Sequence, residues 1–99
     1  MDYITINDHI VIHCGTSLGI HSITAQMETL NKALSIQKTL IIDAEELSEI
    51  DTAAMQLFLA FKNAAARQNI AIQWRNPSKT LMQVSALLGM QEQLGLSSK

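Results

Sequence analysis

Carboxylate side chains crowd into one short stretch of the chain. Asp43, Glu45, Glu46, Glu49 and Asp51 are five of its nine acidic residues. Carboxylates can bind hard cations, but the ligand spacing and the central glycine of an EF-hand loop are missing. A run of like charges outside such a motif is usually a solvated face. We therefore predict an acidic loop and no metal site.

The residue types that serve nucleophilic or metal chemistry are scattered. His9 and His13 share one face of a predicted strand, and a strand rise of about 3.3 Å per residue places them about 13 Å apart. Cys14 follows His13 and points to the opposite face, so the two form no thiol–imidazole pair. The chain has no Ser–His–Asp order, no glycine-rich phosphate loop and no HExxH motif. We expect no enzyme and no cofactor, and the binding of a small ligand stays open.

A hydroxyl stands at the expected start of a long helix. The run Thr39–Asp43 is typical of a strand covered on both faces. After the acidic loop, Asp51 is placed to cap the helix by accepting from the free N–H group of Ala53 or Ala54. Thr52 then lies in the first turn, where the helix dipole stabilises added negative charge by about 0.3–1 kcal/mol in an exposed setting. The position suits phosphorylation of Thr52, although an ordinary helix start has the same pattern.

The rest of the chain alternates between strand and helix patterns. Strands are predicted at 3–6, 9–14, 39–43 and 70–75, and helices at about 20–34, 51–67 and 76–88, with a last turn around 91–94. Loops are predicted at 15–19 and at 44–50, the acidic loop. The first helix is predicted to face the core with Ile20, Ile23, Met27, Leu30 and Leu34. The third is predicted to do so with Leu81, Val84, Leu87 and Leu88. Asn7-Asp8 is a hairpin turn pair, and Asn76-Pro77 predicts a helix capped at Asn76.

This order, β-β-α-β-α-β-α, predicts one α/β domain over residues 1–99. A mixed sheet of about four strands is expected, with the helices packed mainly on one face. With 47% apolar residues but only four aromatic ones, the core must be built from Ile, Leu, Met and Ala.

Charge and composition also restrict the partners. The net charge of −2 and the scattered Lys and Arg residues argue against nucleic acid or anionic lipid as a partner. No apolar run is long enough to cross a bilayer, so no direct membrane insertion is expected. The lone Cys14 favours a reducing cytoplasm.

The helix predicted at 51–67 has apolar side chains on two sides. At 100° per residue, its core side is Ala54, Leu57, Phe58, Phe61, Ala64 and Ala65. The opposite side carries the polar Gln56, Asn63 and Arg67, together with Thr52, Met55, Leu59 and Ala66. We predict that Met55 and Leu59 are exposed beside Thr52. Isolated exposed Leu residues are common, but an apolar patch flanking a hydroxyl is a candidate partner surface.

The segment LIIDAEELSEIDTAAMQLFLAFKNAAARQNI, residues 40–70, resembles the signature region of STAS domains, the fold of bacterial anti-sigma-factor antagonists. That family has an apolar strand ending in Asp, a loop, a D-[ST]-[SAT]-[GA] turn and a helix. The resemblance extends over nearly the whole chain, through INDHIVIHCG as the opening hairpin and NPSKTLMQVSALLGM as the last strand–helix connection.

The resemblance implies a partner switch. In the family, the unmodified domain binds a kinase-type anti-sigma factor through this helix, and phosphorylation of the turn hydroxyl breaks the complex. Asp51 and Thr52 match the first two signature positions, whereas the third, the usual acceptor, is Ala53, and Ala54 replaces the common Gly. Either Thr52 is phosphorylated instead, or this member binds without phosphoregulation.

The partner-binding residues that the resemblance and the helix projection predict are Asp51, Thr52, Ala53, Met55, Gln56 and Leu59. The D-T turn also resembles the small STAS subunits of phospholipid-transporting ABC systems, where the domain docks on the ATPase. Further STAS variants accompany chemotaxis-type signalling clusters. The sequence leaves these three settings open.

Overall fold

Two of the most apolar segments of the chain form the middle of a four-stranded sheet. The computed structural model describes residues 1–96, so residues 97–99 of the predicted domain lie outside the described part. The strand order is β1 (Asp2–Ile6), β2 (His9–His13), β4 (Thr39–Asp43), β6 (Ile72–Arg75). β2, β4 and β6 run parallel, and β1 pairs antiparallel with β2. The predicted mixed four-stranded sheet in an α/β fold is confirmed.

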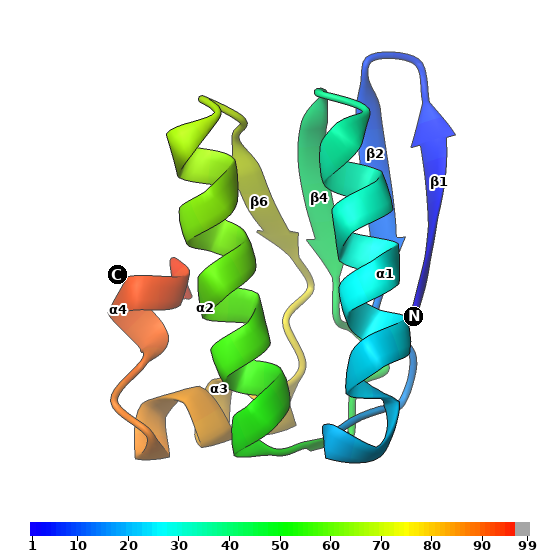
Figure 1. Cartoon of the computed structure of the whole chain (residues 1–99). Coiled ribbons are helices and arrows are strands. Elements are labelled where there is room, and N and C mark those ends of the chain that lie inside the picture. The colour runs from blue at the N-terminus through cyan, green and yellow to red at the C-terminus, as the bar shows by residue number, and fades with distance from the viewer. Residues whose placement is uncertain (97–99) are drawn as a thin grey trace.

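Helices cover one face of this sheet. α1 (Ile23–Ser35), preceded by the 3-10 turn η1 (Ile20–Ser22), and α2 (Thr52–Arg67) lie side by side across it (Figure 1). α3 (Lys79–Leu87) follows β6, runs past the start of α2 and contacts the short strand at 49–50, and α4 (Gln91–Leu94) lies on the side of α2 away from α1. No helix within residues 1–96 is long and apolar enough to cross a membrane.

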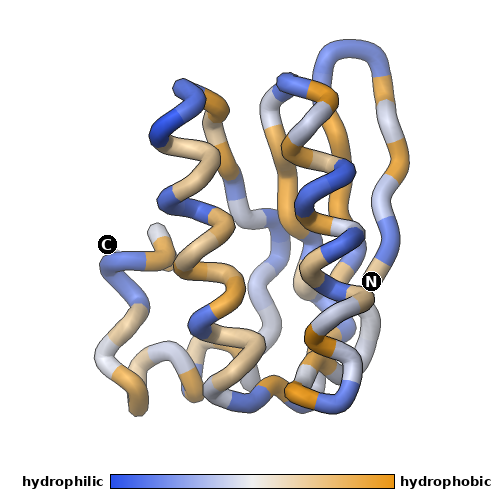
Figure 2. The backbone as a smooth tube through the Cα atoms, in the orientation of Figure 1, coloured by the Kyte–Doolittle hydropathy of each residue, from blue (hydrophilic) through white to orange (hydrophobic). Residues whose placement is uncertain are grey.

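The core lies between the sheet and the helices, and apolar stretches of β2 and β4 face α1 and α2 across it (Figure 2). Its fully buried members include Ile10 and Ile12 from β2, Leu40 and Ile42 from β4, Leu30 from α1 and Phe58 from α2. Trp74 of β6 joins the core at one edge. Its ring stands edge-on to Phe58 with 5.4 Å between centroids, and its indole N–H donates to the Leu94 carbonyl at 2.7 Å. This bond fixes α4 to the edge of the sheet.

A second, two-stranded sheet lies outside the predicted elements. β3 (Ser17–Leu18) and β5 (Glu49–Ile50) pair in parallel. Both segments were expected to be loops. The amides of Ser48 and Glu49 both donate to the carbonyl of Thr16, at 2.9 and 3.1 Å. The acidic stretch is therefore held against the segment that leads into η1, immediately before α2.

Three details of the predicted helices are wrong. The cap of α3 is Ser78, whose hydroxyl accepts from the Leu81 amide at 3.0 Å, because Asn76 has a positive φ of 51° rather than the extended conformation of an N-cap. Leu87 and Leu88, both predicted to face inward, are 86% and 40% exposed, because α3 ends at Leu87 and its buried residues are Leu81 and Ser85. Ile20 and Met27 of the first stripe are exposed as well.

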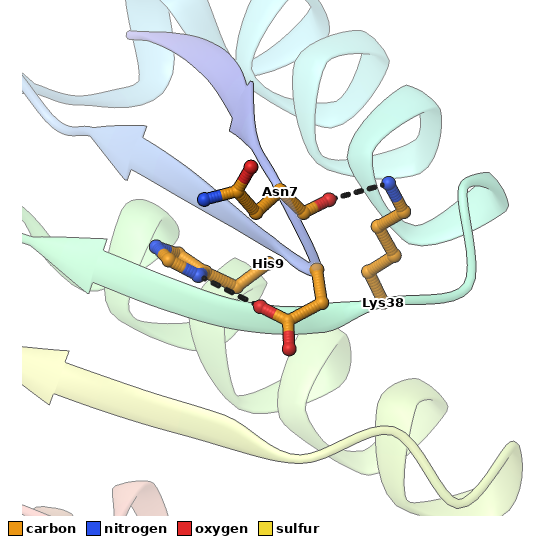
Figure 3. Close-up of polar contacts among 4 residues, drawn as sticks. Asn7, His9 and Lys38 are labelled. Atoms are coloured by element: carbon orange, nitrogen blue, oxygen red, sulfur yellow. Dashed lines mark hydrogen bonds and ion pairs between the residues drawn. The ribbon is translucent and has the colours of Figure 1, made fainter.

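The hairpin turn between β1 and β2 is held at the far end of the sheet from the start of α2. Lys38 donates from Nζ to the Asn7 carbonyl at 2.9 Å, and His9 Nδ1 lies 3.4 Å from the Asp8 carboxylate (Figure 3). Asn7 takes a positive φ of 52°, which Asn tolerates better than most residues. The predicted hairpin turn at Asn7-Asp8 is confirmed.

Candidate functional site at the start of helix α2

One carboxylate joins the starts of two helical segments. Asp51 caps α2, accepting from the Ala54 amide through Oδ1 at 3.0 Å, as predicted. Its other oxygen, Oδ2, accepts from the Ile20 amide at 2.9 Å, where η1 begins. The N–H groups of Ala54 and Ile20 hold the pKa of the Asp51 carboxyl below its usual value. The carboxylate is thus ionised and committed to the backbone at neutral pH.

Gly19 makes this contact possible. Its backbone is extended, with φ of −161°, so no unusual conformation requires a glycine. A Cβ at this position would instead lie 2.9 Å from Asp51 Oδ2, closer than side-chain carbons approach other heavy atoms. The absence of a side chain therefore lets the carboxylate reach the Ile20 amide.

The residues that follow Asp51 form a surface at the carboxyl ends of the parallel strands (Figure 1). Asp51, Thr52 and Gln56 are exposed and Ala53 is half-buried. We call the two hydrogen bonds that Asp51 accepts, from Ala54 and from Ile20, the Asp51 bridge. Ile20, on the other side of this bridge from α2, is 55% exposed. A shallow hollow of about 440 Å³ adjoins Asp51; its lining residues are Ser17, Leu18, Gly19, His21, Ser48, Glu49, Ile50, Asp51 and Thr80. The surface combines hydroxyl groups, a fixed carboxylate and one large apolar side chain.

The prediction that Met55 is exposed is wrong. Met55 is fully buried, and Leu59 is half-buried and packs against the core. The projection assumed one buried side, but α2 has α1 on one flank and α4 on the other (Figure 1). At Lys62, two turns beyond Met55, a Cβ on Gly95 would lie 3.3 Å from Cε, which shows how closely the segment after α4 approaches this flank. Thr52 and Gln56 are exposed at the start of α2, and Met55 is not part of that surface.

The acidic residues do not converge. Asp43 accepts from the Glu45 amide at 3.1 Å, and its Oδ2 lies 3.9 Å from His13 Nδ1 and 3.8 Å from Arg75 Nε. Glu45 and Glu46 are exposed on the loop that follows. Within residues 1–96, no three His, Cys, Asp or Glu side chains are arranged to hold a metal ion.

A polar hollow of about 240 Å³ lies beside Asp43, and Cys14 forms part of its lining. Burial raises the pKa of the Cys14 thiol to about 12. The thiol is therefore protonated at neutral pH and is no nucleophile.

Asp51, Thr52 and Gln56 lie exposed at the start of α2, as the sequence predicts, whereas the contact of Asp51 with Gly19 and Ile20 was not predicted. Ile20 was expected to face the core as part of a helix stripe, and Gly19 was expected to lie in a loop. The contact of both with Asp51 spans about thirty residues of chain, from Ile20 to Asp51. Sequence patterns over a few neighbouring residues cannot predict a contact between segments this far apart.

Comparisons with known proteins identify a family and a similar fold. A family model described as "Mlab, STAS domain" matches residues 5–96. No curated protein matches the chain. Among solved structures, the crystal structure of Mglu superposes with a TM-score of 0.66 over 76% of this chain, at 13% sequence identity. The chain spans only 19% of the length of that protein, so this likeness concerns the fold alone.

Proposed function

Because the chain belongs to the STAS domain family, we propose that it is a regulatory module that binds a protein partner reversibly through the start of α2. The observation that carries this proposal is the Asp51 bridge, in which the Asp51 carboxylate accepts from the amides of both Ala54 and Ile20. It holds two helix starts rigidly and leaves Thr52 exposed between them. A rigid, exposed surface binds with little loss of conformational entropy.

The partner surface that we propose consists of Asp51, Thr52, Ala53 and Gln56, with Leu59 at its margin. Ile20, more than half exposed beside Asp51, supplies the large apolar contact that Met55 was expected to give. A central apolar anchor with a polar rim is the usual arrangement of a protein interface. Met55 supports this surface from within the core.

In the first version of the proposal, Thr52 is phosphorylated and the partner is an anti-sigma factor with serine-kinase activity. The Asp51 carboxylate already occupies the Ala54 amide, so a phosphate on Thr52 gains little from the helix terminus. It adds charge of about −1.5 to −2 beside an ionised carboxylate. Phosphorylation would therefore release a partner by repulsion and by bulk rather than by reshaping α2.

In the second version, the domain is a constitutive subunit of a lipid-transport ABC ATPase. Ala53 supports this version, because the usual phosphoacceptor position of STAS domains carries no hydroxyl here. Thr52 then serves as an unmodified contact in the interface.

Binding titrations with Thr52 variants separate the two versions. Against a kinase-like anti-sigma factor, the switch predicts that Thr52→Glu weakens binding at least about tenfold, a loss of about 1.4 kcal/mol, whereas Thr52→Ala stays bound. Against an ABC ATPase, constitutive docking predicts that wild-type protein isolated from cells carries no phosphate and that Thr52→Ala also weakens binding.

Ala66→Glu is the matched control for Thr52→Glu, since Ala66 is exposed near the far end of α2. It adds the same charge away from the proposed surface and should leave affinity unchanged. If wild type, Thr52→Glu and Ile20→Asp all bind a partner equally well, the partner docks elsewhere and the proposal is wrong.

A further inference from the structure

The face of the sheet turned away from the helices carries an apolar row. Alternation along the strands places Ile4, Val11 and Ile41 on this face, and they are direct register neighbours across β1, β2 and β4. No helix within residues 1–96 covers this face (Figure 1). Ile4, at the edge of the sheet, is 49% exposed, whereas Val11, in the middle of the row, is 1% exposed.

A charged row lies two residues further along the same face. Asp2, His13, Asp43 and Arg75 are register neighbours across all four strands. Reading from β1 to β6, acidic and basic side chains alternate. Asp43 is flanked by His13 and Arg75 at 3.9 and 3.8 Å, while Asp2 ends the row on the opposite edge from Arg75.

We propose that two copies of this chain pack these sheet faces together about a two-fold axis parallel to the strands. Such a rotation reverses the order of the strands, so that β1 of one copy lies over β6 of the other. It does not change the position of a row along the strands, so each row lies over the same row of the other copy. Asp2 of one copy then faces Arg75 of the other, and His13 faces Asp43. The row that contains Ile4, Val11 and Ile41 ends at Gln73 on β6, so Val11 faces Ile41 and Ile4 faces Gln73. In the charged row, each acidic side chain of one copy therefore lies opposite a basic side chain of the other.

The charges also select this axis over the alternative. A two-fold axis across the strands would lay the charged row over the row formed by Ile6, His9 and Thr39. Asp2 would then be desolvated against Ile6 without a partner, which is costly for a carboxylate. Only the axis along the strands pairs opposite charges.

The size of the face sets the strength of the dimer. Four strands about 4.8 Å apart and five residues long cover about 19 by 16 Å. This is less than the roughly 800 Å² per partner of a stable complex, so we expect a reversible dimer that forms at high micromolar concentration. This face of the sheet is turned away from α2, so the dimer would leave Thr52 exposed. The dimer proposal therefore does not depend on the proposed function.

Charge reversal provides the test, read by sedimentation equilibrium from about 1 µM to about 1 mM protein. Asp2→Lys and Arg75→Glu each convert two attractive contacts into two repulsive ones and should weaken dimerisation about tenfold. The double variant should restore it. Within one copy the two residues lie on opposite edges of the sheet, about 14 Å apart, so restoration must occur between copies.

A matched pair of apolar positions controls for general effects. Ile4→Lys should abolish the dimer, whereas Met27→Lys, at a 45% exposed position on the helix side, should leave it intact. Circular-dichroism melts confirm that each variant is folded. A monomeric wild type up to about 1 mM, a double charge variant weaker than both single ones, or equal effects at Ile4 and Met27 would each overturn the proposal.

Discussion

Truncation of Met55 tests whether its side chain belongs to the core or to a partner surface. Met55 is fully buried between α2 and the neighbouring elements. Replacing a buried Met by Ala removes the transfer free energy of the side chain and leaves a cavity, at a cost of about 2–5 kcal/mol. Domains of this size have a total stability of about 5–15 kcal/mol, so Met55→Ala should remove a large part of it.

The expected loss is measurable by thermal and urea unfolding. About 1 kcal/mol shifts the Tm of a domain of this size by about 4–8 °C, so Met55→Ala should lower Tm by at least about 8 °C. The neighbouring Gln56 is exposed, and Gln56→Ala should change stability by no more than about 0.5 kcal/mol. The half-buried Leu59 should give an intermediate loss when it is replaced by Ala.

The opposite result would refute the packing of α2 described above. If Met55→Ala melts within about 2 °C of the wild type, the loss is below about 0.5 kcal/mol and the side chain is not core. An unchanged urea m-value is also required, because a changed m-value would indicate a different denatured state rather than a lost core contact.

Three further predictions concern the Asp51 bridge and Cys14. Gly19→Ala should lower Tm by about 4–8 °C, because its Cβ displaces the Asp51 carboxylate; in an Asp51→Ala background the same change should cost much less, as a double-mutant cycle by thermal melts would show. Because the pKa of Asp51 is lowered in the folded state, its stabilisation is present above the unfolded value of about 3.9 and is lost as pH falls through the folded value. The stability difference between wild type and Asp51→Asn should therefore shrink from pH 7 to about pH 3 in urea titrations, and a pH-independent difference would contradict the assignment. Cys14 should react with iodoacetamide at about pH 8 more than about a hundredfold slower in the folded than in the urea-unfolded protein, since burial raises its pKa to about 12; comparable rates by mass spectrometry would show an accessible thiol.

Local sequence patterns determined the elements that line the core. The apolar runs at His9–His13 and Thr39–Asp43 form the two central strands, and Asp51 caps α2 through Ala54 as its position indicates. These features depend on neighbours within four residues, through strand alternation and free helix amides, and a single sequence contains that information. The resemblance in the D-T turn then indicated the STAS family, which the family match bears out.

Contacts between distant segments decided which side chains are exposed. Met55 was expected on the surface but is buried in the core, in a domain where α2 has α1 on one flank and, on the other, α4, which the Trp74–Leu94 bond holds to β6. Ile20 was expected in the core but is exposed beside Asp51. Helical periodicity gives the direction of a side chain relative to its own helix axis. Whether another part of the chain occupies that direction depends on the tertiary packing of segments far apart in sequence.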